Sequence, residues 1–251
     1  MPHSRDLSWD GCVNVRDLGG HAVEDGRETR FGAVVRADSI RQLSDDGWAA
    51  LADYGVSRIV DLRFHSDREA DPPRDLPAEV VHVPLLPEID DAEWTEIDAV
   101  GDAAPDALAA TRGVYLEFLE RRRAQFGEAV VAVADAPEGA VVVHCLGGKD
   151  RTGLVVALLL RLAGVDHEAI ASDYGLSEQN LLGLTRDWID SAEDEAERER
   201  RLRISRTPPE AMSAVLAELE RRYGSVRSYL EAAGVDAAAL DAATARLVGS
   251  S

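Results

Sequence analysis

The sequence predicts an α/β protein with a mainly parallel central sheet flanked by helices. Short apolar runs of strand length alternate along the chain with longer segments whose apolar residues recur at helical spacing. Strands and helices that alternate in this way form parallel sheets covered by helices. With 251 residues, 45% of them apolar, the chain is long enough for one large domain or two small ones.

The first half of the chain contains three candidate strands. The apolar runs cover residues 33–38 (AVVRAD), 56–63 (VSRIVDLR) and 79–86 (EVVHVPLL). Between the first two runs, residues 44–55 are predicted as a helix, with Ser44 as its N-cap and Gly55 just after its last turn.

The second half contains longer helices and one further strand. Apolar residues recur at helical spacing from residue 105 to 126, which predicts a helix facing the core, and a second short helix should follow Gly127. Residues 140–144 (AVVVH) read as a buried strand. After a polar loop, the helix predicted from Arg151 ends at Gly164.

The charge balance is strongly acidic. The chain carries 47 acidic and 27 basic residues, a formal net charge of −20. Such a surface repels nucleic acids and anionic membranes at long range, so we expect no nucleic-acid partner. An anionic substrate would need a strong local cluster of positive charge.

Cysteine content and hydropathy bear on the compartment. Two cysteines, Cys12 and Cys145, are too few for a disulfide framework and favour a reducing compartment. No apolar segment typical of a secretory signal is visible at the start, and the apolar run after Thr152 is too short to span a bilayer. We therefore expect a cytoplasmic protein without stable membrane insertion, with export by a signal-less route left open. The sequence does not indicate the oligomeric state.

Two segments stand out by their charge. Residues 87–106 carry eight acidic residues and no basic one, and residues 190–203 mix six acidic residues with four arginines. Both are consistent with solvated helix faces or mobile loops. The sharper interpretation is that helical insertions within 87–106 and 175–205 form lids over a site at the carboxyl edge of the sheet.

The loop between the strand at 140–144 and the next helix has the composition of an anion-binding site. Backbone N–H groups of such a loop, placed at a helix N-terminus, can surround a tetrahedral anion. Gly147 and Gly148 allow the backbone to approach a ligand closely, and the planar guanidinium group of Arg151 can grip two anion oxygens.

Cys145 lies where this positive field would act on its thiol. The field favours the thiolate, and a thiolate held under a phosphoryl group is placed for in-line attack. The Thr152 hydroxyl could bond the sulfur and help it to leave in a second step. We expect His144 to orient the cysteine backbone rather than contact the substrate.

Other interpretations of the loop fit less well. A nucleotide-binding P-loop needs Ser or Thr after Gly-Lys and a glycine five residues before its second glycine, but Asp150 and Val143 stand there. A zinc site is not indicated, because His144 and Cys145 are adjacent and no partner pair is nearby. We expect neither a metal nor a cofactor.

The segment HCLGGKDRTG (144–153) resembles the active-site signature of cysteine-dependent phosphatases, and most of all that of the bacterial tyrosine/serine phosphatase family. Further similar segments are NVRDLGG (14–20), VVRADSIRQLSDDG (34–47), VSRIVDLRFHSDREADP (56–72), DYGLSEQNL (173–181) and PPEAMSAVLAELERRYGSVRSYLEAAGV (208–235). Together they span roughly residues 10–245. The resemblance therefore implies a tyrosine-phosphatase-like fold and a single phosphatase domain over 1–251.

The resemblance also implies roles for the loop residues. Cys145 carries over as the nucleophile and Arg151 as the phosphate clamp. The backbone of Leu146, Gly147, Gly148, Lys149 and Asp150 carries over as phosphate ligand. In phosphatases with lysine at this loop position, the extra cation is associated with phosphoinositides, although Lys149 could simply neutralise the substrate dianion. One departure is Phe64, which stands where the family more often has a small polar residue.

The general acid that protonates the leaving group is open between two aspartates. The resemblance favours Asp150, inside the loop. Asp61, at a strand end, is the second candidate, although it could instead hold Arg63, a possible substrate-binding cation, or Lys149. The acidic segment 87–106 is a third source.

These patterns together predict a metal-independent phosphoric monoester hydrolase that acts through a cysteinyl-phosphate intermediate. By resemblance its partners are phosphotyrosine substrates and, beyond them, phosphoserine/threonine proteins or phosphoinositides. The alternative is a module that recognises phosphate without turning it over, and a rhodanese-like sulfur transferase is a related possibility. The combination of Cys145, Arg151 and Thr152 argues for hydrolysis, because recognition alone needs no thiol.

Overall fold

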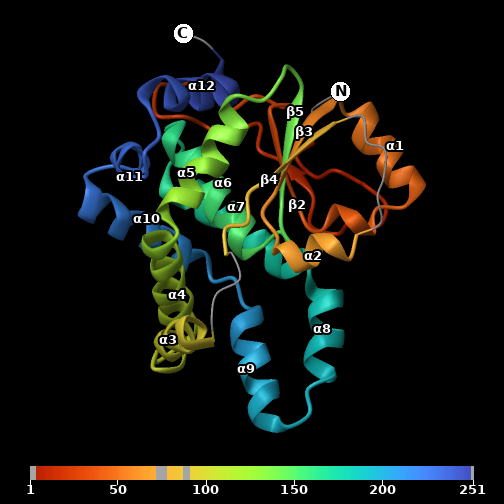
Figure 1. Ribbon diagram of the computed structural model, residues 1–251, viewed down its shortest axis with the longest axis vertical. Helices are drawn as coiled ribbons and strands as arrows, with labels where there is room; N and C mark the ends of the chain where they lie inside the picture. Colours follow the sequence, from red (N-terminus) through yellow and green to blue (C-terminus); the bar gives the residue numbers. More distant parts are fainter. Residues whose placement is uncertain (1–3, 72–77, 87–90, 250–251) are drawn as a thin grey trace.

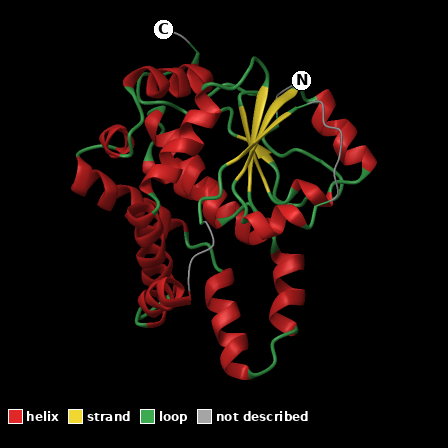
Figure 2. Ribbon diagram, viewed as in Figure 1, coloured by secondary structure: helices red, strands yellow, loops and turns green. Residues whose placement is uncertain are grey.

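The computed structural model describes residues 4–71, 78–86 and 91–249. A five-stranded sheet in the order β1-β2-β5-β3-β4 lies at its centre, with helices on both sides (Figure 1, Figure 2). The strands are β1 (Arg16–Asp17), β2 (Val34–Ala37), β3 (Val56–Asp61), β4 (Glu79–His82) and β5 (Ala140–His144).

The predicted mainly parallel sheet is confirmed. β2, β5, β3 and β4 run parallel, and only the short β1 is antiparallel to its neighbour. In the register of the three central strands, His144 is level with both Ala37 and Asp61. The residues that follow β2, β3 and β5 therefore meet at one edge of the sheet, where parallel α/β proteins place their sites.

Helices cover both faces of the sheet (Figure 1). On one face lie the short 3₁₀ helix η1 (Ile40–Gln42) and α1 (Asp45–Asp53), while α2 (His65–Glu69) lies at the lower edge of the sheet in Figure 1. The other helices are α3 (Asp91–Asp102), α4 (Ala107–Arg121), α5 (Arg123–Ala134), α6 (Asp150–Leu162), α7 (His167–Asn180), α8 (Leu182–Asp190), α9 (Glu195–Ser205), α10 (Pro209–Tyr223), α11 (Val226–Ala232) and α12 (Ala237–Val248).

The ends of α1 agree with the sequence prediction. The Ser44 side chain accepts a hydrogen bond from the N–H of Gly47 at 3.2 Å, which satisfies one of the free donors of the first turn. After the last turn, Gly55 has φ of +79°, a conformation that glycine adopts without a steric penalty.

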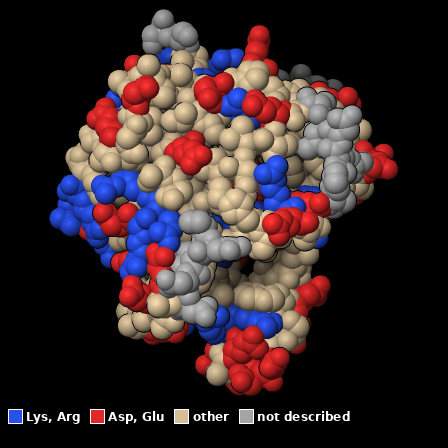
Figure 3. Space-filling model, viewed as in Figure 1, with Lys and Arg blue, Asp and Glu red and all other residues tan. Residues whose placement is uncertain are grey.

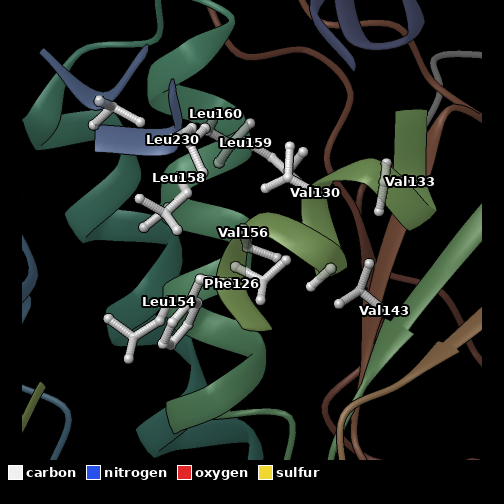
Figure 4. Close-up of a cluster of buried hydrophobic side chains, with 14 of the residues drawn as sticks. Phe126, Val130, Val133, Val143, Leu154, Val156, Leu158, Leu159, Leu160 and Leu230 are labelled. Carbon is white, nitrogen blue, oxygen red and sulfur yellow. The ribbon is translucent and has the colours of Figure 1, made fainter. Parts of the chain in front are cut away.

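The largest core lies between the sheet and α5, α6 and the C-terminal helices (Figure 4). Every residue of α6 from Thr152 to Leu160 is buried, and its apolar side chains pack against those of α5, such as Phe126 and Val130. Burial on this scale fixes α6 firmly against β5, so the loop that joins them has two rigid ends.

One predicted helix boundary is wrong. The segment 105–126 does not form one helix, because α4 ends at Arg121 and α5 begins at Arg123. Gly127 lies inside α5, where a Cβ would come within 2.9 Å of Val235 Cγ2. The glycine therefore permits close helix packing and does not end a helix.

Both charged segments contain the expected helices. Within 87–106, residues 87–90 lie outside the described residues and the rest contains α3. Within 175–205, α8 and α9 form a hairpin that extends from the body beside α3 and α4 (Figure 1). Among the described residues, no helix is both long and apolar enough to cross a membrane.

Candidate active site

Cys145 directly follows β5, the central strand of the sheet, and opens the loop that leads into α6. Its side chain lies on the sheet edge and the residue is 3% exposed. Because β5 and α6 are buried against the rest of the core, the positions of both ends of this loop are fixed. The N-terminus of α6 adds its partial positive charge to the loop.

Three consecutive carbonyl groups of the loop are hydrogen-bonded from behind. The donors are Ser39 N to Leu146 O (2.9 Å), Asn14 Nδ2 to Gly147 O (2.9 Å) and Arg36 Nη2 to Gly148 O (2.8 Å). In a trans peptide the N–H points away from the carbonyl of the preceding residue, and all peptide bonds described here are trans. The N–H groups of residues 147, 148 and 149 therefore point to the other side of the loop, as an anion nest requires.

Gly148 is required by this geometry. Its φ is +63°, and a Cβ there would lie 2.4 Å from the carbonyl oxygen of Ala37. The loop can thus approach β2 closely enough for Arg36 to reach it. Gly147 is different, since a Cβ there would make only an ordinary contact with Leu181 at 3.7 Å.

A buried ionic cluster holds the residues that brace the loop. Asp173 on α7 pairs with Arg16 at 2.9 Å and Arg36 at 2.5 Å, and it also pairs with Arg5. Burial alone would raise the pKa of Asp173, but the positive charges of Arg36 and Arg16 lower it well below its usual range. The carboxylate thus stays ionised and fixes the two buried guanidinium groups.

Asn14 connects this cluster to the loop. Its side-chain oxygen accepts from Arg16 Nη1 at 2.6 Å, while its amide nitrogen donates to the loop carbonyls. Asp38 in turn accepts the backbone N–H of Asn14 at 3.1 Å. Sequence reasoning did not identify these residues as part of the site. The available signal was Arg36 within the otherwise apolar strand β2, since a buried guanidinium needs a buried partner.

Asp150 is the acidic residue within the loop, and it lines the cavity above it. Its side chain is 45% exposed, and its Oδ1 accepts a hydrogen bond from the Tyr115 hydroxyl at 2.5 Å. Lys149 Nζ lies 3.4 Å from the same oxygen and donates to the carbonyl of Ile204 at 2.5 Å. Both loop residues thus face α4 and α9.

Arg151 has contacts on the β3 side of the loop. Its Nη1 donates to the Leu62 carbonyl at 3.4 Å, and its guanidinium carbon lies 4.8 Å from the centre of the Phe64 ring. An arginine over an aromatic face gains a cation–π contact. Phe64, the departure from the family pattern, therefore forms a platform for the predicted phosphate clamp.

Asp61 and Arg63 form a buried pair. Arg63 donates to Asp61 Oδ1 through Nε at 3.0 Å and to Oδ2 through Nη2 at 2.8 Å, and it also pairs with Asp71. Burial would raise the pKa of Asp61, but the hydrogen bonds from Arg63 lower it to about 2. This geometry fits the alternative in which Asp61 holds Arg63, whose Nη1 also donates to Ser39 Oγ at 3.4 Å.

His144 and Thr152 flank the cysteine. His144 Nδ1 lies 3.2 Å from the Cys145 carbonyl, and burial lowers the pKa of the imidazole, so the ring is neutral at pH 7. The Thr152 hydroxyl is fully buried and has no hydrogen-bond partner among the described residues. The His144 contact fits a role in orienting the Cys145 backbone, whereas the Thr152 hydroxyl makes no hydrogen bond to the Cys145 sulfur in this structure.

A cavity of about 630 Å³ opens above the loop. Leu146, Gly147, Lys149, Asp150 and Arg151 form its floor. Its walls come from α3, α4, α8 and α9, and their apolar members are Trp94, Ala110, Val114, Phe118, Leu184, Trp188 and Ile204. The cysteine loop thus lies at the base of an apolar, partly aromatic cleft.

The two charged segments meet across this cavity. On α9, Arg200 lies 3.2 Å from Asp98 of α3, and Arg203 pairs with Asp102. Figure 3 shows basic groups across the part of α9 nearest the body and acidic groups at the tip of the hairpin. Among the described residues, no group of three or more His, Cys, Asp and Glu side chains is placed to hold a metal ion.

The sequence is similar to those of known phosphatases. The family model for the tyrosine phosphatase family matches residues 7–249. The tyrosine-protein phosphatase of Nostoc commune is 32% identical over 81% of this chain and 70% of its own length. The triple specificity protein phosphatase PtpB of Mycobacterium tuberculosis is 27% identical over 95% of this chain and 98% of its own length.

The solved structure of P. aeruginosa TpbA is 17% identical in sequence over 80% of this chain and 97% of its own length, with a TM-score of 0.31. The match over residues 7–249 takes in nearly the whole chain, including the cysteine loop and every residue that braces it. The chain therefore belongs to the tyrosine phosphatase family.

Proposed function

We propose that this phosphatase hydrolyses phosphate monoesters through a cysteinyl-phosphate intermediate on Cys145. The observation that carries the proposal is the braced loop. Three of its carbonyl groups are bound from behind, so three N–H groups face the space above Cys145. Such a nest stabilises the equatorial oxygens of a phosphoryl group, and Arg151 adds a bidentate donor beside it.

The first step forms the intermediate. The Cys145 thiolate attacks phosphorus, the phosphorus–oxygen ester bond breaks, and its electron pair goes to the bridging oxygen. Asp150 protonates this oxygen, so the product leaves as a neutral phenol or alcohol. We assign the acid to Asp150 because its carboxyl group faces the cavity, whereas that of Asp61 is paired with Arg63 and ionised.

The second step restores the enzyme. Asp150, now a carboxylate, accepts a proton from water while the water oxygen attacks phosphorus. The sulfur–phosphorus bond breaks, and the thiolate and inorganic phosphate are released. The buried hydroxyl of Thr152, which has no partner among the described residues, is available to donate to the departing sulfur.

We propose phosphotyrosine as the principal substrate. Trp94, Phe118 and Trp188 offer apolar surface for an aromatic leaving group above the loop. Two relatives are named as a tyrosine-protein phosphatase and as a triple specificity phosphatase. Phosphoserine, phosphothreonine and phosphoinositide substrates extend this proposal, with Lys149 as the additional cation. We further propose one domain over 1–251, with 87–106 and 175–205 as its lids, acting in the cytoplasm.

The test compares leaving groups. p-Nitrophenolate leaves unaided, whereas phenolate is more basic and needs protonation, and the two phosphate esters have nearly the same shape. If Asp150 is the acid, Asp150→Asn should slow phenyl phosphate by about 10²–10⁴-fold and p-nitrophenyl phosphate at least tenfold less. Asp187→Asn, an exposed aspartate on α8, is the matched control and should change neither rate.

Two outcomes would contradict the proposal. If Asp150→Asn slows both esters equally, Asp150 positions the loop and is not the acid. If EDTA abolishes hydrolysis of p-nitrophenyl phosphate by the wild type, the reaction needs a metal. A comparison of kcat/KM for phosphotyrosine, phosphoserine and phosphothreonine peptides and phosphoinositides then ranks the substrate classes.

A further inference from the structure

We propose that Tyr115 of α4 and Tyr174 of α7 are positioning residues for Asp150, and that they decide which carboxyl oxygen carries the catalytic proton. This inference depends on the proposed role of Asp150 as general acid. Neither tyrosine belongs to the loop, and neither needs to contact the phosphoryl group.

The three side chains form a continuous chain of hydrogen bonds. The Tyr115 hydroxyl donates to Asp150 Oδ1 at 2.5 Å, and the two tyrosine hydroxyls lie 2.8 Å apart. Tyr115 is 3% exposed and Tyr174 is 1% exposed, so water cannot readily replace either bond. Tyr115 also lines the cavity above the loop.

The number of hydroxyl protons determines which group donates in each of these hydrogen bonds. A tyrosine hydroxyl has one proton, and Tyr115 gives it to the carboxylate. Tyr174 must therefore donate to the oxygen of Tyr115. Burial first, and then the negative charge of Asp150, raise the pKa of both hydroxyls, so both remain protonated donors at neutral pH.

This chain of hydrogen bonds involves Oδ1 of Asp150 and leaves Oδ2 without a partner among the described residues. Both of its nearby polar partners, Tyr115 and Lys149, approach Oδ1. Within the described part of the chain, no side chain or backbone group hydrogen-bonds to Oδ2. Because Oδ1 is occupied as an acceptor, the proton of the neutral acid resides on Oδ2, which can turn it toward the bridging oxygen of the ester.

A purely structural role for the tyrosines predicts a different pattern. The two rings pack edge to face, with centroids 6.1 Å apart and an interplanar angle of 79°. Phenylalanine preserves this packing and removes only the hydroxyl. Loss of packing would slow all substrates alike, whereas loss of acid positioning slows only the substrates whose leaving group needs the proton.

The experiment measures kcat/KM of Tyr115→Phe for phenyl phosphate and for p-nitrophenyl phosphate. We expect a loss of about tenfold for phenyl phosphate, the effect of one hydrogen bond to a charged group, and less than about twofold for p-nitrophenyl phosphate. Tyr174→Phe removes the donor behind Tyr115 and should give a smaller loss with the same selectivity. If Tyr115→Phe does not fold, as judged by thermal unfolding, Tyr174→Phe alone decides the question.

Tyr229→Phe is the matched control. Tyr229 is equally buried, and its hydroxyl donates at 2.8 Å to the Leu119 carbonyl, away from Asp150. This variant should leave the ratio of the two rates unchanged. The double variant Tyr115→Phe/Asp150→Asn should be no slower on phenyl phosphate than Asp150→Asn alone, because the tyrosine acts only through the acid.

The outcomes separate this inference from the proposed function. If Asp150→Asn is selective for phenyl phosphate but Tyr115→Phe slows both esters equally, the positioning role is wrong and the acid assignment stands. The same holds if Tyr115→Phe adds its full effect to that of Asp150→Asn. If Asp150→Asn itself shows no selectivity, the acid assignment fails and the positioning role fails with it.

Discussion

Replacement of Asp61 by Asn separates a structural aspartate from a catalytic one. Asp61 and Arg63 are both buried and share two side-chain hydrogen bonds, of 3.0 and 2.8 Å. The pKa of Asp61 is about 2 in the folded protein, compared with 3.8 for a free side chain. That difference corresponds to about 2 kcal/mol of stability at neutral pH. For a chain of this size, Asp61→Asn should therefore lower Tm by about 4–8 °C.

The contribution of Asp61 to the free energy of unfolding should depend on pH. Because folding lowers the pKa of Asp61, its contribution is fully present above about pH 4 and is lost as the pH falls toward 2. Urea unfolding of wild type and Asp61→Asn should thus differ by about 2 kcal/mol at pH 7 and converge as the pH falls below 4. Asp241→Asn removes an exposed partner of Arg227 and should unfold as the wild type does.

One result would refute this reasoning. If Asp61→Asn keeps wild-type stability at pH 7 but loses much more activity, relative to the wild type, on phenyl phosphate than on p-nitrophenyl phosphate, Asp61 is the acid. The bidentate pair with Arg63 would then have to open during turnover. Equal slowing of both esters together with the stability loss is the expected pattern.

Three further predictions concern the loop and its surroundings. Cys145→Ser should abolish turnover yet still bind a phosphotyrosine peptide in calorimetry, because the nest and Arg151 remain; turnover near the wild-type rate would exclude the cysteine mechanism. Asp173→Asn should cost about 3–5 kcal/mol in urea unfolding, since it leaves buried arginines unpaired, and a loss below 1 kcal/mol would contradict this. Peroxide should inactivate the enzyme, and a thiol reductant should restore the activity of Cys12→Ala as fully as that of the wild type. Burial, and then Asp38, raise the pKa of the Cys12 thiol and keep it unreactive. If the wild type recovers but Cys12→Ala does not, Cys12 is the resolving cysteine.

The loop was predictable because its determinants are contiguous. A buried strand, two glycines, an arginine and a buried helix follow one another within 140–164, and each restricts the backbone of the next. The same is true of α1, whose cap at Ser44 and end at Gly55 are local features. Local determinants of this kind can be read without knowledge of the fold.

The residues around the loop were not predictable, because they act over long separations. Asn14 reaches Gly147 across 133 positions, and Arg36 reaches Asp173 across 137. Helical spacing alone predicts Tyr115 as a core residue, which it is, but spacing cannot show that its hydroxyl meets Asp150. The helix break was predicted at Gly127 but lies at Arg122 for the same reason. Gly127 is small because residues 233–235 pack against it, and not because a helix ends there.

The tethered carbonyl groups of the loop also affect what happens after hydrolysis. A loop whose backbone is already fixed loses little conformational entropy when an anion enters it. Inorganic phosphate fills the same nest as the substrate and lacks only the leaving group, so the rigidity that favours capture of the ester equally favours retention of the product. Phosphate should therefore raise the melting temperature of the resting enzyme in proportion to the logarithm of its concentration and compete with the substrate for the free enzyme. In phosphate-rich surroundings, the rate of turnover would then depend as much on vacating the loop as on the chemistry performed in it.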